Sequence, residues 1–241
     1  MRLFLDTASI DEIREINRWG VLSGVMTNPT LVAREGLDPD RVWKEILAEV
    51  KGDVSLETTE PEAGPMYEQG LRLAAMGENA VVKVPMTPAG LEAGRRLTDE
   101  GIRINVTLVF SPAQAILAAE VGAYIVSPFL GRIDDAGADG MHALRQICEI
   151  YAVQGYDTNV LAASLRHPMH VVDSALAGAD IEAVKAAHEA LVGASQEFAQ
   201  RLYAAASAQQ GAAGGAQAPS DDEVAEAEAM ADAIRRAIGR V

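Results

Sequence analysis

The chain has 241 residues, 49% of them hydrophobic, and a formal net charge of −15. This length suits one α/β barrel of about 250 residues, and length alone also allows two small domains. A chain this acidic lacks the basic surface that nucleic acids and anionic membranes bind. We therefore expect neither partner, while a local pair of arginines could still bind a phosphorylated small molecule.

The sequence also points to a compartment. No apolar run reaches the roughly 20 residues that span a bilayer, and the start of the chain lacks the pattern of a secretory leader. The single cysteine, Cys148, excludes an internal disulfide framework and fits a reducing environment. We expect a cytoplasmic protein in which Cys148 is a buried, inert thiol.

Short apolar runs alternate with longer amphipathic segments along most of the chain. The expected strands are residues 2–7, 22–27, 54–58, 80–84, 102–107, 123–127 and 159–163. The expected helices are residues 11–19, 40–50, 62–76, 88–100, 112–121, 141–153 and 168–176, several of which begin at proline. Apolar runs followed by helices indicate buried parallel strands. The pattern predicts a (β/α)8 barrel, with an open doubly wound sheet as the main alternative.

The eighth strand is the weak part of this pattern. Residues 180–184 are its only candidate, and they contain Glu182 and run directly into a helical pattern over residues 185–206. Residues 204–220 are rich in Ala, Gly, Gln and Ser, a composition typical of flexible linkers. We expect a barrel domain over residues 1–203, a linker over 204–220 and an extra C-terminal helix over 221–241, capped by Ser220.

Polar side chains occur at the carboxyl end of every clear strand, where α/β barrels place their chemistry. They are Asp6, Asn28, Glu57, Lys83, Asn105, Thr107, Ser127, Ser164 and Arg166. One such residue would mean little, but packing alone does not explain polar groups at seven strand ends in register. The pattern predicts a single site at this end of the barrel.

Lys83 carries the sharpest signal. It is the only one of four lysines inside an apolar strand, since the others lie on amphipathic segments. Desolvation there would lower the pKa of the amine and make it nucleophilic toward carbonyls. The alternative is a lysine paired with a buried carboxylate for structure. Acidic residues at neighbouring strand ends favour the catalytic interpretation, a Schiff base on Lys83.

A Schiff-base aldol reaction needs three kinds of helper. Asp6 is the candidate that removes the proton from the substrate hydroxyl, although a turn or helix-cap role is the alternative. Glu57, with Thr107, could carry protons during carbinolamine formation and dehydration. Neutral donors that could hold sugar hydroxyls are Asn28, Asn105 and Ser127.

Two arginines follow the last clear strands. Arg132 and Arg166 could each bind a phosphate through the planar fork of the guanidinium, with Ser164 as a further donor. Surface salt bridges are the alternative. The four histidines show no metal-ligand spacing, and no nucleotide-binding motif is present. We therefore expect no metal or cofactor, and surface or capping roles for the histidines, including His167 and His170.

Several motifs resemble the transaldolase family. They are Leu-Asp-Thr-Ala at 5–8, Thr-Asn-Pro-Thr at 27–30, Val-Lys-Val-Pro at 82–85, Asn-Val-Thr-Leu at 105–108, Ser-Pro-Phe at 127–129 with Gly-Arg at 131–132, and Ala-Ser-Leu-Arg at 163–166. The order and spacing are similar to those of the short-subunit bacterial transaldolases, which share their fold with fructose 6-phosphate aldolases.

The resemblance implies a role for each candidate. Lys83 would be the Schiff-base nucleophile and Asp6 the acid/base group, while Glu57 and Thr107 would position the catalytic water. It implies substrate contacts at Asn28, Asn105 and Ser127, and a phosphate site at Arg132, Ser164 and Arg166. It implies no cofactor, and phosphosugars as substrates.

Two positions separate the sister activities within the resemblance. The aldolases carry tyrosine where this chain has Phe129, and glutamine where it has Glu57. The tyrosine hydroxyl helps to protonate the enamine and release free dihydroxyacetone, so phenylalanine favours transfer to an aldehyde acceptor. The expected reaction moves a dihydroxyacetone unit from fructose 6-phosphate or sedoheptulose 7-phosphate to an aldose phosphate. The alternatives are a dihydroxyacetone-releasing aldolase, a sulfonated ketose as donor, and a non-catalytic phosphosugar-binding barrel.

The resemblance also bears on assembly. Family members usually form ring-shaped homo-oligomers in which a terminal helix packs on a neighbouring subunit. This chain departs from the family pattern after Asp180, where Glu-Ala-Val-Lys at 182–185 replaces a clear strand and its Val-Pro element. We expect a homo-oligomer and leave its size open.

Overall fold

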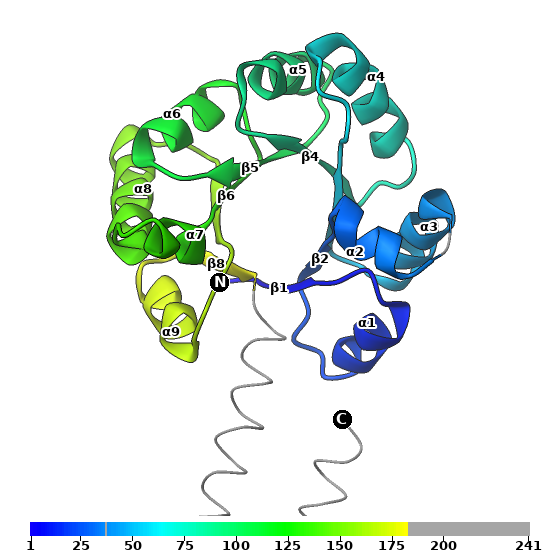
Figure 1. Ribbon diagram of the computed structural model, residues 1–241, viewed down its shortest axis with the longest axis horizontal. Coiled ribbons are helices and arrows are strands. Elements are labelled where there is room, and N and C mark those ends of the chain that lie inside the picture. The colour runs from blue at the N-terminus through cyan, green and yellow to red at the C-terminus, as the bar shows by residue number, and fades with distance from the viewer. Residues whose placement is uncertain (37, 183–241) are drawn as a thin grey trace, which may run out of the picture. The chain divides into compact units, whose positions relative to one another are not determined.

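The computed structural model describes residues 1–36 and 38–182. Within them, eight parallel strands pair in sequence order and close into a barrel (Figure 1). The strands are β1 (Leu3–Asp6), β2 (Gly24–Met26), β3 (Asp53–Glu57), β4 (Ala80–Pro85), β5 (Ile104–Val109), β6 (Ile125–Pro128), β7 (Asn159–Ala162) and β8 (Asp180–Glu182). The predicted (β/α)8 barrel is confirmed, and the open sheet is excluded.

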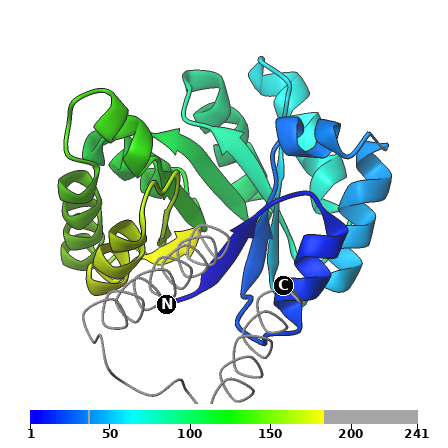
Figure 2. The ribbon, with the colours of Figure 1, turned by 60° about the horizontal axis from the view of Figure 1, so that its bottom comes forward.

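Helices surround the barrel on its outside (Figure 2). They are α1 (Ile10–Asn17), α2 (Pro29–Arg34), α3 (Pro39–Glu49), α4 (Ala63–Ala74), α5 (Pro88–Asp99), α6 (Pro112–Glu120), α7 (Leu130–Asp135), α8 (Gly140–Gln154) and α9 (Pro168–Leu176). Proline is the first residue of five of them, namely α2, α3, α5, α6 and α9. None of the described helices is both long and apolar enough to cross a membrane.

Two helices, α2 and α7, were not predicted from the sequence. Each has six residues and follows a strand end almost directly. Six residues are too few to show a helical repeat of apolar side chains. Asn28 begins α2 by accepting a hydrogen bond from the Leu31 N–H at 3.0 Å.

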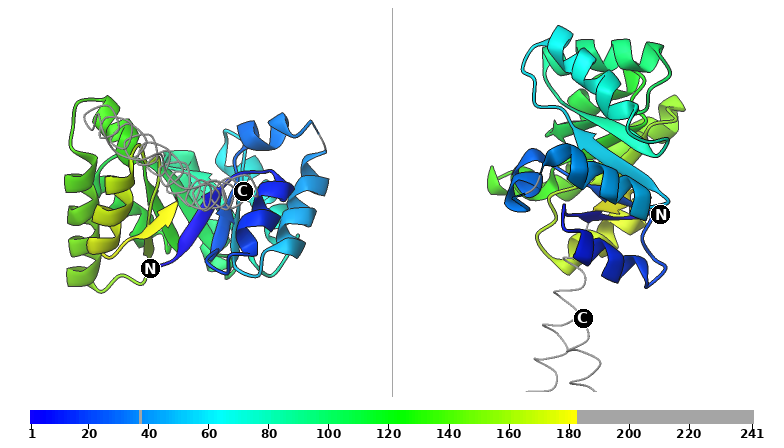
Figure 3. Two further views of the ribbon diagram at one scale, coloured as in Figure 1. Left: turned by 90° about the horizontal axis from the view of Figure 1, so that it is seen from below. Right: turned by 90° about the vertical axis from the view of Figure 1, so that its right-hand side faces the viewer.

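Strand β8 closes the barrel although it has only three residues. Its backbone pairs with β7 through Leu161 and Asp180, and with β1 through Leu3 and Ile181. Figure 3 shows β8 and β1 side by side. The expected boundary of the barrel domain at residue 203, the linker and the C-terminal helix lie outside the described residues.

The apolar side chains form two cores. The larger one lies between the strands and the surrounding helices. The smaller one fills the barrel and consists of Phe4, Met26, Ile125 and Leu161, all fully buried. Each comes from a different strand, as expected for layered side chains inside a barrel of parallel strands.

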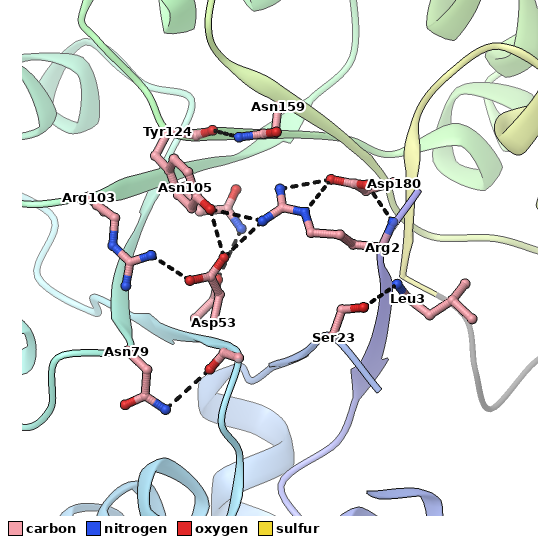
Figure 4. Close-up of polar contacts among 12 residues, drawn as sticks. Arg2, Leu3, Ser23, Asp53, Asn79, Arg103, Asn105, Tyr124, Asn159 and Asp180 are labelled. Carbon is pink, nitrogen blue, oxygen red and sulfur yellow. Dashed lines mark hydrogen bonds and ion pairs between the residues drawn. The ribbon is translucent and has the colours of Figure 1, made fainter. Parts of the chain in front are cut away.

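A charged cluster lies at the amino ends of the strands, the opposite end of the barrel from the predicted site. Figure 4 shows its contacts. We call Arg2, Asp53, Arg103, Tyr124 and Asp180 the lower network. The Asp53 carboxylate accepts hydrogen bonds from Arg2 Nη1 at 3.0 Å, Tyr124 Oη at 2.9 Å and Arg103 Nη1. Arg2 Nε also donates to Asp180 Oδ2 at 2.9 Å. The network therefore ties the starts of five strands, β1, β3, β5, β6 and β8, together by charge-assisted hydrogen bonds.

Candidate active site

Lys83 lies on β4, between Glu57 of β3 and Asn105 of β5. Its side chain is almost fully buried, and Nζ lies 3.0 Å from Glu57 Oε2. Nζ also donates to the Thr27 carbonyl oxygen at 2.9 Å. The pairing of β3 with β4 places Glu57 and Lys83 directly side by side. The lysine therefore has the carboxylate partner that the structural interpretation requires, and a proton acceptor that the catalytic interpretation requires.

A chain of buried hydrogen bonds crosses the barrel beside Lys83. Ser127 Oγ donates to Asn105 Oδ1 at 2.9 Å, and Asn105 Nδ2 donates to Ser55 Oγ at 3.3 Å. All three side chains are at most 1% exposed. The two bonds hold the Asn105 amide between the two serine hydroxyls. Ser55 was missed from the sequence, although a serine inside an apolar strand two residues before Glu57 was a usable signal.

The remaining predicted groups stand at neighbouring strand ends. Asp6 ends β1 and is exposed, and Thr107 of β5 is buried opposite Pro85 of β4. Asn28 follows β2, and its side-chain oxygen is used by the cap of α2. Its amide N–H groups are left as the donors that a substrate hydroxyl could use.

The two predicted arginines flank the start of α7. Arg132 is exposed on α7, and its guanidinium forms no ion pair with any described residue. Arg166 Nη2 lies 2.6 Å from Asp135 Oδ2, where both side chains are about half exposed. The surface salt bridge expected as the alternative is therefore present at Arg166, and its exposure leaves the guanidinium open to a competing anion.

Gly131 allows α7 to approach the turn that carries Ser164 and Arg166. Its N–H donates to the Ser164 carbonyl oxygen at 2.9 Å. A Cβ at Gly131 would lie 2.5 Å from both Cγ and Nε of Arg166, closer than real Cβ atoms come. Ser164 itself has φ 58, a left-handed conformation that is uncommon for a residue with a side chain.

Phe129 lies between β6 and α7 and is half-buried. Its ring packs edge to face with Phe110, with ring centroids 6.1 Å apart. Phe110 follows an irregularity in the pairing of β5 with β6, where Leu108 has φ 59. The irregular backbone gave no sequence signal, so the contribution of Phe110 to this aromatic pair was not predicted.

The sequence indicated a surface or capping role for His170. The surface position is wrong because the side chain is buried, while its Nδ1 accepts from the Arg166 backbone N–H just before α9. Cys148 is half-buried, and burial raises the pKa of its thiol to about 11, so the inert protonated form predominates at neutral pH. Among residues 1–36 and 38–182, no group of three or more His, Cys, Asp or Glu side chains could hold a metal ion.

Comparisons with known proteins agree with the motifs. The family described as Transaldolase/Fructose-6-phosphate aldolase matches residues 3–236. A probable transaldolase 1 from Bacillus cereus is 54% identical over 77% of this chain and 86% of its own length. A probable transaldolase from Aquifex aeolicus is 54% identical over 75% of this chain and 83% of its own length.

A solved structure supports the fold alone. Thiamine phosphate pyrophosphorylase from Pyrococcus furiosus superposes with a TM-score of 0.55 at 16% identity, covering 78% of this chain and 91% of that one. The family match over nearly the whole chain and the 54% identity to relatives carry the assignment. The chain belongs to the transaldolase/fructose-6-phosphate aldolase family and is a transaldolase-type enzyme.

Proposed function

We propose that the protein transfers a dihydroxyacetone unit from a ketose phosphate to an aldose phosphate through a Schiff base on Lys83. The observation that carries this proposal is the position of Lys83, buried at a strand end with Nζ 3.0 Å from Glu57. The other two described lysines, Lys44 and Lys51, are exposed and lie outside the barrel strands. Lys83 is therefore the described amine best placed to attack a bound carbonyl.

Schiff-base formation requires the neutral amine, so a proton must first leave Nζ. Glu57 can accept it directly, because the carboxylate already contacts the ammonium. Nζ then adds to the C2 carbonyl of the ketose, and the carbinolamine loses water to give the iminium. Thr107, buried on the adjoining strand β5, can help to hold that water near Glu57.

Bond cleavage requires a base at the C4 hydroxyl. Asp6, at the end of β1, is the candidate that removes this proton. The C3–C4 bond then breaks, its electron pair moves into the iminium to form an enamine, and the first aldose departs. Attack of the enamine on a second aldehyde and hydrolysis of the new iminium release the product ketose and restore the free lysine.

The polar chain and the arginines supply binding and specificity. Asn105, oriented by Ser55 and Ser127, can hold the hydroxyls of the three-carbon unit, with Asn28 as a further donor. Ser164, Arg132 and Arg166 can bind the phosphate. A guanidinium binds a sulfonate as readily, so a sulfonated ketose is the second candidate donor. We expect this chemistry in the cytoplasm and in a homo-oligomer.

Phe129 favours transfer over release. A phenyl ring offers no hydroxyl to protonate the enamine, and Phe110 packs against its edge. The enamine therefore persists until an aldehyde acceptor arrives. A dihydroxyacetone-releasing aldolase would need a proton donor at this position, and a non-catalytic barrel would be expected to lack a lysine or an acid/base residue at the site.

Borohydride reduction tests the proposal. The protein is incubated with fructose 6-phosphate, reduced with sodium borohydride and analysed by peptide mass spectrometry. We expect a dihydroxyacetone-derived adduct on Lys83, and no adduct in Lys83→Met analysed in parallel. If folded wild-type protein gives no adduct with several ketose phosphates and a sulfonated ketose, the binding-barrel alternative is favoured instead.

A further inference from the structure

The turn that carries Ser164 and Arg166 is held by a buried histidine that the proposed chemistry does not use. His170 lies on α9 and is 4% exposed. Its Nδ1 accepts a hydrogen bond from the Arg166 backbone N–H at 3.2 Å. A histidine nitrogen accepts a hydrogen bond only when it carries no proton. The contact therefore requires the tautomer with its proton on Nε2.

Asp134 favours that same tautomer. Its Oδ2 lies 3.3 Å from His170 Nε2, where the proton must sit. Its other oxygen, Oδ1, accepts from the Gly140 N–H at 2.8 Å at the start of α8. Asp134 thus joins α7, α8 and His170 at one point, and the orientation of the imidazole is fixed from both of its nitrogens.

The turn is also held from its other side. The Leu130 N–H donates to the Ala163 carbonyl oxygen at 3.0 Å, and the Gly131 N–H donates to that of Ser164 at 2.9 Å. Between these bonds and His170, Ser164 adopts its left-handed backbone at φ 58. Such a conformation costs free energy and persists where surrounding contacts enforce it. His170 supplies a further contact, from α9 to the Arg166 N–H.

Charges around His170 keep its acceptor available. Burial lowers the pKa of His170, and the neighbouring His167 ring, 3.8 Å away between centroids, lowers it further. Asp134 and Asp173 act in the opposite direction, while Arg166 lowers the pKa. The net effect favours the neutral imidazole, so Nδ1 can accept the Arg166 N–H at neutral pH.

We propose that His170 is a positioning residue for phosphate recognition, holding the Arg166 backbone so that the Ser164 hydroxyl and the Arg166 guanidinium face the same anion as Arg132. This inference rests on the proposed function, which makes these three residues the phosphate site. It predicts that losing the His170 acceptor weakens the binding of phosphate groups and leaves the chemistry at Lys83 unchanged. If His170 had a purely structural role, its loss would impair phosphate binding and the chemistry at Lys83 together.

Two substitutions at His170 test the proposal. Asparagine places its side-chain oxygen near the position of Nδ1 and can still accept from Arg166, whereas glutamine reaches toward Asp134 and leaves that N–H without its acceptor. We expect His170→Gln to raise KM for fructose 6-phosphate about fivefold, as for one lost neutral hydrogen bond. The kcat of His170→Gln is expected to stay within about twofold, and His170→Asn to keep KM within about twofold of wild type.

Inorganic phosphate provides a readout that does not depend on turnover. Its dissociation constant, measured by calorimetry on the free protein, is expected to rise with KM in His170→Gln and to recover in His170→Asn. Asp173→Asn, which leaves both hydrogen-bond partners of His170 in place, is the matched control and is expected to behave as wild type. If His170→Gln does not fold, Asp134→Ala is measured instead and is expected to raise the same constant.

The outcomes separate the two proposals. Equal phosphate binding by wild type and His170→Gln, or an equal loss in His170→Gln and His170→Asn, would overturn the role of His170. So would an unchanged constant in Asp134→Ala where that variant is needed. Failure of wild-type protein to form the Lys83 adduct would instead overturn the proposed function, whatever the variants do.

Discussion

The two ends of the barrel are built from the same strands, but they differ in how their charged side chains are paired. Strand β3 contributes Asp53 to the lower network and Glu57 to the candidate site, four residues further along. In the lower network, two arginines and two aspartates form ion pairs with one another. At the other end, Lys83 is paired, whereas Arg132 has no ion-pair partner among the described residues and Arg166 has an exposed one.

This difference suggests that one strand, β3, contributes to stability at its amino end through Asp53 and to the candidate site at its carboxyl end through Glu57. Charged side chains that pair with one another are not available to bind a ligand. Removing one partner of such a pair destabilises the fold, because the other charge is left unpaired. Exposed or singly paired charges can exchange a partner for a substrate. The amino end therefore holds strand starts together, and the carboxyl end, where barrels of this kind carry their active sites, holds the charges that we propose bind substrate.

Two single substitutions, Asp53→Asn on β3 and Lys83→Met on β4, are expected to have the largest effects. Measured separately, they test the comparison between the two ends of the barrel. Asp53→Asn leaves Arg2 and Arg103 without their shared carboxylate, and we expect a loss of about 2–3 kcal/mol in the free energy of unfolding. For a domain of this size that lowers Tm by roughly 5–10 °C. Lys83→Met is expected to lower kcat by a thousandfold or more, as for loss of a nucleophile, with a smaller change in Tm.

Calorimetry and transfer kinetics on the same preparations check this pair. Below its Tm, Asp53→Asn is expected to retain kcat within about twofold, because Asp53 lies roughly 13 Å along the strand from Glu57. A large loss of kcat in folded Asp53→Asn would show that the two ends are coupled through the interior of the barrel, contrary to the separation argued above.

A change at Phe129 is expected to have an intermediate effect, on the fate of the enamine. Phe129→Tyr adds a hydroxyl at the aromatic pair, where it can help water to protonate the enamine. We expect free dihydroxyacetone release, relative to transfer, to rise about tenfold, equivalent to about 1.4 kcal/mol in barrier height. A coupled assay for free dihydroxyacetone measures it. Phe110→Tyr serves as the control, and no rise specific to position 129 would contradict the assignment.

The sequence predicted the barrel, which the structure confirms, and it singled out the candidate site residues, because both depend on local patterns. Apolar runs alternate with helices, and polar residues such as Lys83 and Asn105 follow apolar ones at the strand ends. The lower network was not predicted, since Arg2 and Asp180 stand at opposite ends of the described chain and look like ordinary strand-flanking charges. Ser55 had a local signal that was overlooked, whereas the roles of the lower network and of His170 had none. The role of His170 depends on Arg166 and Asp134, and the contact with Asp134 forms only in the folded barrel.

The smallest expected effect concerns Asp135, which competes for Arg166 at the candidate phosphate site. The pair is exposed on both sides, 47% at Arg166 and 58% at Asp135, so solvent screens it. Exposed pairs of this kind contribute about 0.2–1 kcal/mol. Asp135→Asn frees the guanidinium for the substrate, and we expect KM for a phosphorylated ketose to fall by up to about threefold, with little change in Tm.

Steady-state kinetics at low and high salt check this prediction. Screening weakens exposed pairs, so the gain is expected to shrink as salt is added. Asp99→Asn, which breaks the exposed Arg95–Asp99 pair on α5, is the matched control and is expected to leave KM unchanged. A rise in KM for Asp135→Asn would mean that the carboxylate orients Arg166 toward the ligand. The Arg166–Asp135 pair at the carboxyl end of the barrel would then have a structural role, as the ion pairs of the lower network do.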